Sequence, residues 1–113
     1  MISNSQIQDG NGASLAFLDI DERRLAKHVP VASALRAAPA QIVNEIIYLA
    51  NLQIDSWEKN SLCSSDYISA WRELLKRPND AASILEERSS HAAALRQNSP
   101  FVASVRKFQA RAA

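Results

Sequence analysis

The sequence contains no glycine after Gly12, because the two glycines of this 113-residue chain are Gly10 and Gly12. A loop that cradles a phosphate needs glycines so that the backbone can approach the phosphate, and the dinucleotide-binding fingerprint needs three of them. A nucleophile elbow needs glycine on both sides of its serine, and tight hairpin turns also favour glycine. The sequence therefore lacks the usual motifs of nucleotide-binding enzymes and serine hydrolases.

The length indicates one small domain, and the net charge indicates no strong electrostatic attraction to nucleic acid. One domain is the expected number for this length, and the net charge is only +1. No apolar run is long enough to span a membrane, and the N-terminus lacks the basic and apolar regions of a secretory signal. The single Cys63 cannot form an internal disulfide. Together these features predict a cytoplasmic protein.

Apolar residues recur at helical spacing along most of the chain, which predicts an all-α bundle of four to five short helices. Residues 1–13 are polar and turn-prone, so we expect a disordered N-terminal arm before a single helical domain over residues 14–113. Residues 14–20 fit either a short buried strand or the start of a helix. Pro30 should break or kink a helix, and Pro39 suits the start of the next one.

The strongest predicted element is a helix over residues 40–59, which we expect at the centre of the bundle. Five of its residues alternate steps of four and three, the spacing of a seam between helices: Val43, Ile47, Ala50, Ile54 and Trp57. Tyr48 and Leu52 lie outside the main apolar arc, and on a monomer they would form an exposed patch. We therefore predict that this helix pairs two copies of the chain, and that all seven residues lie at a dimer or partner interface.

The later helices must end without glycine. Asn60 can end the helix over residues 40–59, since asparagine tolerates the left-handed conformation. Ser64 or Ser65 should cap the next helix, whose apolar stripe contains Trp71. Asn79 or Asp80 should cap the one after it, with a break at residues 89–90, and Ser99–Pro100 should begin the last helix.

The C-terminal end of the chain is basic, since residues 88–113 contain five basic residues and no acidic one. Such an end on a more acidic body can dock an acidic partner surface or nucleic acid. A solvated helix face with favourable charges near a C-terminus is the ordinary alternative. The candidate docking surface consists of Arg96, Arg106, Lys107 and Arg111.

Residue spacing gives no support to metal binding or catalysis. The two histidines, His28 and His91, have no second histidine or cysteine at ligand spacing, and Cys63 stands alone. Adjacent carboxylates on one helix point in different directions and do not share a site. We therefore predict no catalytic residue, no metal and no cofactor, and a protein that is not an enzyme.

The two-sided helix over Ile42–Trp57 and the stripe around Trp71 suit a protein that acts by contact with another protein. In size and helical character the chain resembles small anti-activators that bind LuxR-type quorum-sensing transcription factors. That resemblance implies a bacterial regulator that occupies a transcription factor. An antitoxin that neutralises a toxin, or a secretion chaperone, would share the same character.

Residues 14–58 also allow a DNA-binding alternative. Leu15–Ile20 would be a strand, Asp21–Ala38 a first helix, and Pro39-Ala40-Gln41-Ile42 the start of a second helix. This order resembles ribbon–helix–helix antitoxins and repressors. However, the strand carries Asp19 and no basic residue to contact phosphates or bases, and Pro30 interrupts the first helix.

Overall fold

The computed structural model describes the backbone of residues 4–112 and the side chains of residues 20–111. Within these residues the chain forms six α-helices and no strand, which confirms the all-α bundle. The number exceeds the four to five expected, because the chain divides into several short helices after residue 60. The helices are α1 (Asn4–Ala37), α2 (Ala40–Lys59), α3 (Ser65–Leu75), α4 (Pro78–Glu86), α5 (Ser90–Gln97) and α6 (Val102–Ala112).

Helix α1 continues through Pro30, where we expected a break or a kink, and it includes residues 14–20. A proline inside a helix removes one backbone hydrogen bond and costs about 3 kcal/mol. Val31, Ala32 and Leu35, which follow the proline, are buried in the core, and this packing holds the helix beyond it.

The helical backbone of α1 begins at Asn4, inside the segment for which we expected a disordered arm. The structure therefore shows no change at residue 14, where the helical domain was expected to begin. Residues 1–3 of the expected arm lie outside the described residues. The disorder of the arm stays a prediction.

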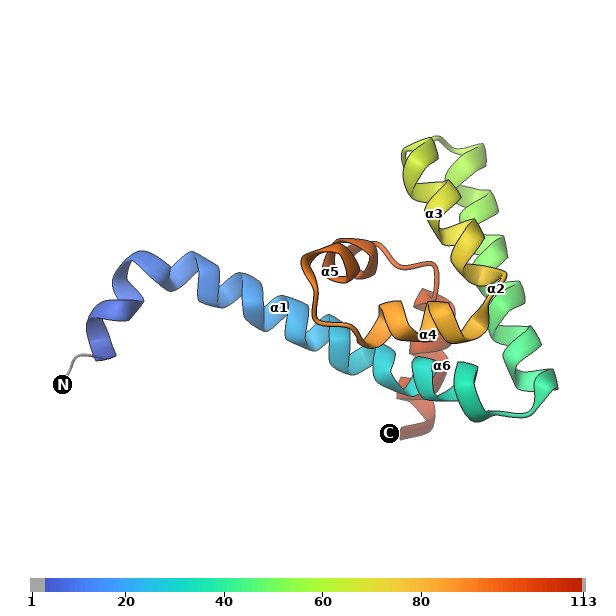
Figure 1. Cartoon of the computed structure of the whole chain (residues 1–113), viewed down its shortest axis with the longest axis horizontal. Helices are drawn as coiled ribbons and strands as arrows, with labels where there is room; N and C mark the ends of the chain where they lie inside the picture. The colour runs from blue at the N-terminus through green and yellow to red at the C-terminus, as the bar shows by residue number, and fades with distance from the viewer. Residues whose placement is uncertain (1–3, 113) are drawn as a thin grey trace.

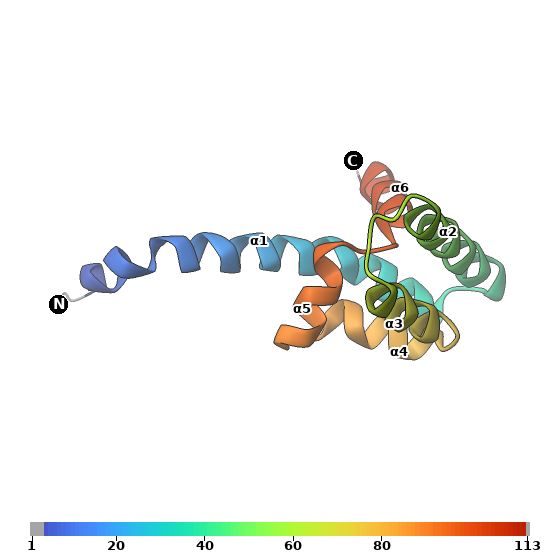
Figure 2. The same cartoon turned by 90° about the horizontal axis from the view of Figure 1, so that it is seen from above.

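The second half of α1 is the axis of the bundle. Helix α4 lies along one side of it, and α6 crosses it on the opposite side (Figure 2). Helices α2 and α3 form an antiparallel pair at one end, while the N-terminal part of α1 extends beyond the other helices (Figure 1). The molecule is therefore elongated, with extents of 54 × 32 × 23 Å.

The core lies where α1, α2, α3, α4 and α6 meet. Trp71 is fully buried there, and its ring packs edge-on against Phe101 with centroids 5.6 Å apart. The hydroxyl of Tyr67 lies 2.7 Å from the carbonyl oxygens of both Leu95 and Asn98, so its hydrogen is shared between them at the end of α5. Trp71 and Tyr67 of α3 therefore hold the C-terminal part of the chain against the α2–α3 pair, through ring packing and hydrogen bonds respectively.

Helix α2 ends in a left-handed residue, but that residue is Ser61 (φ 55°) and not Asn60 (φ −102°). The N–H of Leu62 donates to the carbonyl of Trp57 at 2.9 Å, and the N–H of Ser61 donates to that of Glu58 at 3.3 Å. This is the Schellman arrangement, with serine where glycine is usual. Asn60 helps in another way, because its side-chain amide donates to the carbonyl of Ser56.

One serine cap and one break between helices are as expected. The Oγ of Ser64 accepts a hydrogen bond from the backbone N–H of Tyr67 at the start of α3. The Oγ of Ser89 accepts one from Ala92, which confirms the break between α4 and α5.

Two helix starts differ from expectation. Helix α4 begins at Pro78, ahead of the expected caps Asn79 and Asp80, because proline suits the first helical turn, where its missing N–H is not needed. Helix α6 begins at Val102, after the expected start at Ser99–Pro100.

Candidate protein-binding surface

The apolar seam of α2 is covered by the same chain. Ala50, Ile54 and Trp57 are buried in the core, and Val43 and Ile47 are partly buried against it. We expected these five residues to pair two copies of the chain. The other helices of the same chain cover Ala50, Ile54 and Trp57 instead, and they leave only Val43 and Ile47 partly accessible on this side of α2.

Tyr48 and Leu52 lie on the opposite side of α2 and remain exposed, by 61% and 46% respectively. They are four residues apart on one helix, so their side chains are neighbours on its surface. They are the two members of the predicted interface that are exposed. We call Tyr48 and Leu52, with their charged neighbours Glu45, Asp55 and Lys107, the outer face.

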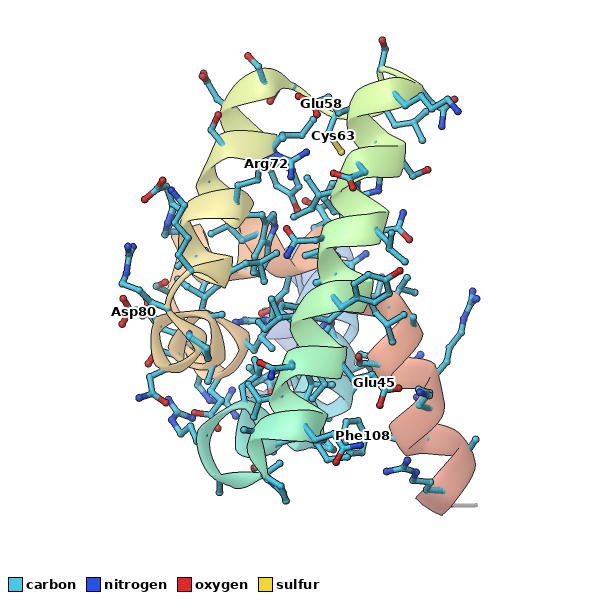
Figure 3. The ribbon with its side chains drawn as sticks, turned by 90° about the vertical axis from the view of Figure 1, so that its right-hand side faces the viewer. Glu45, Glu58, Cys63, Arg72, Asp80 and Phe108 are labelled. Carbon is cyan, nitrogen blue, oxygen red and sulfur yellow. The ribbon has the colours of Figure 1, made fainter. Side chains whose placement is uncertain are left out.

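Helix α6 forms one margin of the outer face. Lys107 on α6 makes an ion pair with Glu45, one turn before Tyr48 on α2, and Figure 3 shows Glu45 directed toward α6. The Lys107 ammonium donates a hydrogen bond to Glu45, and this bond holds the pKa of that carboxyl below its usual value. Next to it, Phe108 packs against the core, and the Arg111 guanidinium lies 5.7 Å from the centroid of its ring. Three of the four predicted basic residues, Arg106, Lys107 and Arg111, are exposed on this helix.

Helix α3 forms the other margin. Arg72 reaches from α3 to α2, where it donates to Asp55 at 3.0 Å and to Glu58 at 2.9 Å (Figure 3). These hydrogen bonds raise the pKa of Arg72. The sequence offers no signal for this contact, because it joins residues on two helices and not neighbours on one. The outer face therefore has an apolar centre and charged margins on both sides.

Arg96 is the predicted basic residue that does not lie on a docking surface. Its side chain is fully buried, and its guanidinium donates to the carbonyls of Ile84 (2.9 Å) and Glu87 (2.5 Å). The Oδ1 of Asp21 lies 3.6 Å from its Nη2. Arg96 thus satisfies the carbonyl groups at the C-terminal end of α4, a structural role that removes it from contact with partners.

Cys63 is partly buried and lies beside Asn98, whose amide nitrogen is 3.2 Å from its sulfur. Among the described residues, no three His, Cys, Asp or Glu side chains form a group that could hold a metal ion. None of the described helices is long and apolar enough to cross a membrane. No protein-family model matches the chain, and neither a curated protein nor a solved structure does.

Proposed function

We propose that this protein is a non-enzymatic regulator that binds another protein through the outer face of α2. The observation that carries the proposal is the exposure of Tyr48 and Leu52, side by side, on a helix whose other face is packed in the core. An aromatic and an aliphatic side chain framed by charged residues have the composition of the centre of a protein interface. Burial of this patch in a complex would remove apolar surface from water, at about 25 cal/mol per Å².

The neighbouring basic residues favour a partner with an acidic surface. Arg106, Lys107 and Arg111 are exposed on α6, which packs beside the outer face, and residues 88–113 contain no acidic residue. Opposite charges across an interface speed association and select the partner. A transcription factor or a toxin with an acidic groove would suit this surface, and an anti-activator of a LuxR-type regulator is one protein of this kind.

The ribbon–helix–helix alternative lacks the strand that would contact DNA. It needs a strand at Leu15–Ile20, and that segment is helical in α1. A strand that pairs with a second copy to form a ribbon is therefore not formed there, and we do not propose DNA binding.

The test is a comparison of three immobilised proteins in an extract of the source organism: the wild type, the double variant Tyr48→Ser/Leu52→Ser, and the control Leu62→Ser. Leu62 is the control for nonspecific hydrophobic binding. It is exposed by 63%, but it lies in the turn after α2 and outside the outer face. We expect one protein to be retained by the wild type and by the control. Its recovery should fall about tenfold or more with the double variant, the effect of losing about 1.4 kcal/mol of binding free energy.

Two results would contradict the proposal. The first is equal recovery of the same protein by the double variant and the wild type. The second is loss of helicity by the double variant in circular dichroism, because Tyr48 and Leu52 would then be needed for the fold itself.

A further inference from the structure

A pocket of about 250 Å³ lies between α1, the C-terminal half of α2, and the turn from α5 to α6. Two elements supply positive charge to its lining: Arg24 and Lys27 come from α1, and Arg96 comes from α5. No acidic residue is among the described residues that line it. The remaining lining residues are neutral, and they include Gln53, Trp57, Val102 and Val105.

His28 is one of two buried polar residues that line this pocket, with 6% of its surface exposed, and Arg96 is the other. Its Nδ1 lies 2.7 Å from the carbonyl oxygen of Arg24. A carbonyl can only accept a hydrogen bond, so Nδ1 carries the proton and donates. The other ring nitrogen, Nε2, is buried and has no hydrogen-bond partner among the described residues. The Nε of Arg96 is likewise buried without a hydrogen-bond partner, and its Nη2 has no hydrogen bond but lies 3.6 Å from the carboxylate of Asp21.

Unpaired polar atoms in a buried site are unfavourable, and a bound group that pairs with them removes that disadvantage. Positive charges that line one pocket repel each other. An anion bound between them is attracted to each of them, and this attraction offsets the repulsion. Asp21 lies near Arg96, but it does not line the pocket. An acceptor with negative charge would therefore satisfy the Arg96 guanidinium, and it would satisfy the Nε2 of His28 once that nitrogen is protonated.

We propose that this pocket binds a small oxyanion, either a carboxylate or a phosphate monoester, that carries an apolar group. Its oxygens would lie near Arg24, Lys27 and His28, and its apolar group would lie against Trp57, Val102 and Val105. The pocket holds the volume of roughly eight water molecules at about 30 Å³ each, which suits a ligand the size of benzoate. This inference does not rest on the outer face, and it adds a small-molecule site to a protein-binding surface.

Binding at this site should be linked to a proton. Burial is the main cause that lowers the pKa of His28, and the charges of Arg96 and Lys27 lower it further, against the opposite effect of its bond to the Arg24 carbonyl. The ring is therefore neutral near pH 7, and its Nε2 is then an acceptor that an anion cannot use. Protonation converts Nε2 into a donor, and a bound anion favours the protonated form. Anion binding should therefore take up a proton and become tighter as the pH falls.

The test uses benzoate and phenyl phosphate as probes and benzamide as the uncharged control, each titrated into the full chain by calorimetry. We expect one or both anions to bind, and benzamide to bind at least about tenfold more weakly, a difference of about 1.4 kcal/mol. Binding of benzoate alone would identify a carboxylate ligand, and binding of phenyl phosphate alone would identify a phosphate monoester. Benzoate stays ionised at pH 5.5, and we expect it to bind about threefold or more tightly there than at pH 7.5.

A matched pair of variants locates the site. Lys27→Gln removes an exposed charge that lines the pocket, while Arg106→Gln removes an exposed charge on α6 that does not. The first should weaken anion binding about fivefold or more, and the second should change it less than about twofold. No binding of either anion at about 10 mM would overturn the proposal, as would equal binding of benzamide or equal effects of the two variants.

Discussion

At the scale of single residues, the structure divides the basic residues into two kinds that look alike in the sequence. Arg106, Lys107 and Arg111 are exposed on α6, as expected. Arg96 is buried and binds the last carbonyls of α4, and His28 is buried between charged neighbours. The position of Arg96 depends on where α4 ends relative to α5, which no local pattern specifies. His28 could have been noticed, because Arg24, Lys27 and His28 are spaced by three and four residues and share one helix face.

The first prediction concerns the buried guanidinium. Replacing Arg96 with methionine leaves the carbonyls of Ile84 and Glu87 and the carboxylate of Asp21 without their partner. We expect Arg96→Met to lower the free energy of unfolding by about 3 kcal/mol in urea titrations. The control Arg106→Met removes an exposed charge and should change it by less than about 0.5 kcal/mol. Equal effects of the two variants would show that the Arg96 side chain does not stabilise the C-terminal end of α4.

The second prediction concerns pH and His28, whose pKa is lowered in the folded state, mainly by burial. Below about pH 6.5, the ordinary pKa of histidine, the unfolded chain gains a proton that the folded chain binds less readily. Stability should therefore be constant near pH 7.5 and fall as the pH is lowered through about 6.5 to 5.5, because the loss begins at the unfolded pKa.

Urea midpoints measured across that window check the assignment. The variant His28→Gln should show a flatter pH dependence than the wild type. The variant His91→Gln, which alters an exposed residue on α5, should keep the dependence of the wild type. An unchanged slope in His28→Gln would contradict the prediction.

At the scale of elements, features set by short-range chemistry could be predicted and features set by packing could not. The bounds of α2, the serine cap of α3 and the break before α5 follow from helical periodicity and capping, and they are confirmed. The continuation of α1 through Pro30 depends on burial of the residues that follow it. Periodicity also identified both apolar sides of α2. It could not show that the chain's own helices would cover the seam, because a second copy would produce the same pattern.

The third prediction concerns the end of α2. Ser61 holds a left-handed backbone with φ of 55°, a conformation that glycine adopts without a steric penalty. We expect Ser61→Gly to raise the free energy of unfolding by about 1 kcal/mol, measured by urea denaturation. Ser69→Gly makes the same change at an exposed position inside α3 and should lower it by about 0.5 kcal/mol. A loss of stability in Ser61→Gly would contradict the Schellman end.

At the scale of the whole molecule, the chain forms a bundle that covers its own seam and leaves the outer face exposed. The all-α class followed from periodicity, and Tyr48 and Leu52 were located as an off-arc patch from the same pattern. Their charged margins could not be predicted, because Glu45–Lys107 and Asp55–Arg72 join different helices. The function we propose depends on this whole arrangement and not on a motif.

The fourth prediction concerns pairing of two copies, which we retain as a proposal for the outer face alone. Because the chain's own helices cover most of the seam, we propose that a dimer uses the exposed Tyr48 and Leu52. Sedimentation at micromolar concentration should show a dimer of the 12.4 kDa chain, and Tyr48→Ser/Leu52→Ser should sediment as a monomer. A dimer that survives in the double variant would place the contact elsewhere, and a wild type that is only monomeric would exclude pairing.

The central claim is that the outer face of α2 contacts the partner. Its most direct test is nuclear magnetic resonance of the ¹⁵N-labelled wild type, free and with the protein captured from the extract. We predict that the largest changes in chemical shift or line width fall at Tyr48, Leu52 and Lys107, while α4 changes little. Unchanged signals at Tyr48 and Leu52, with the largest changes on α4 or α5, would contradict the claim.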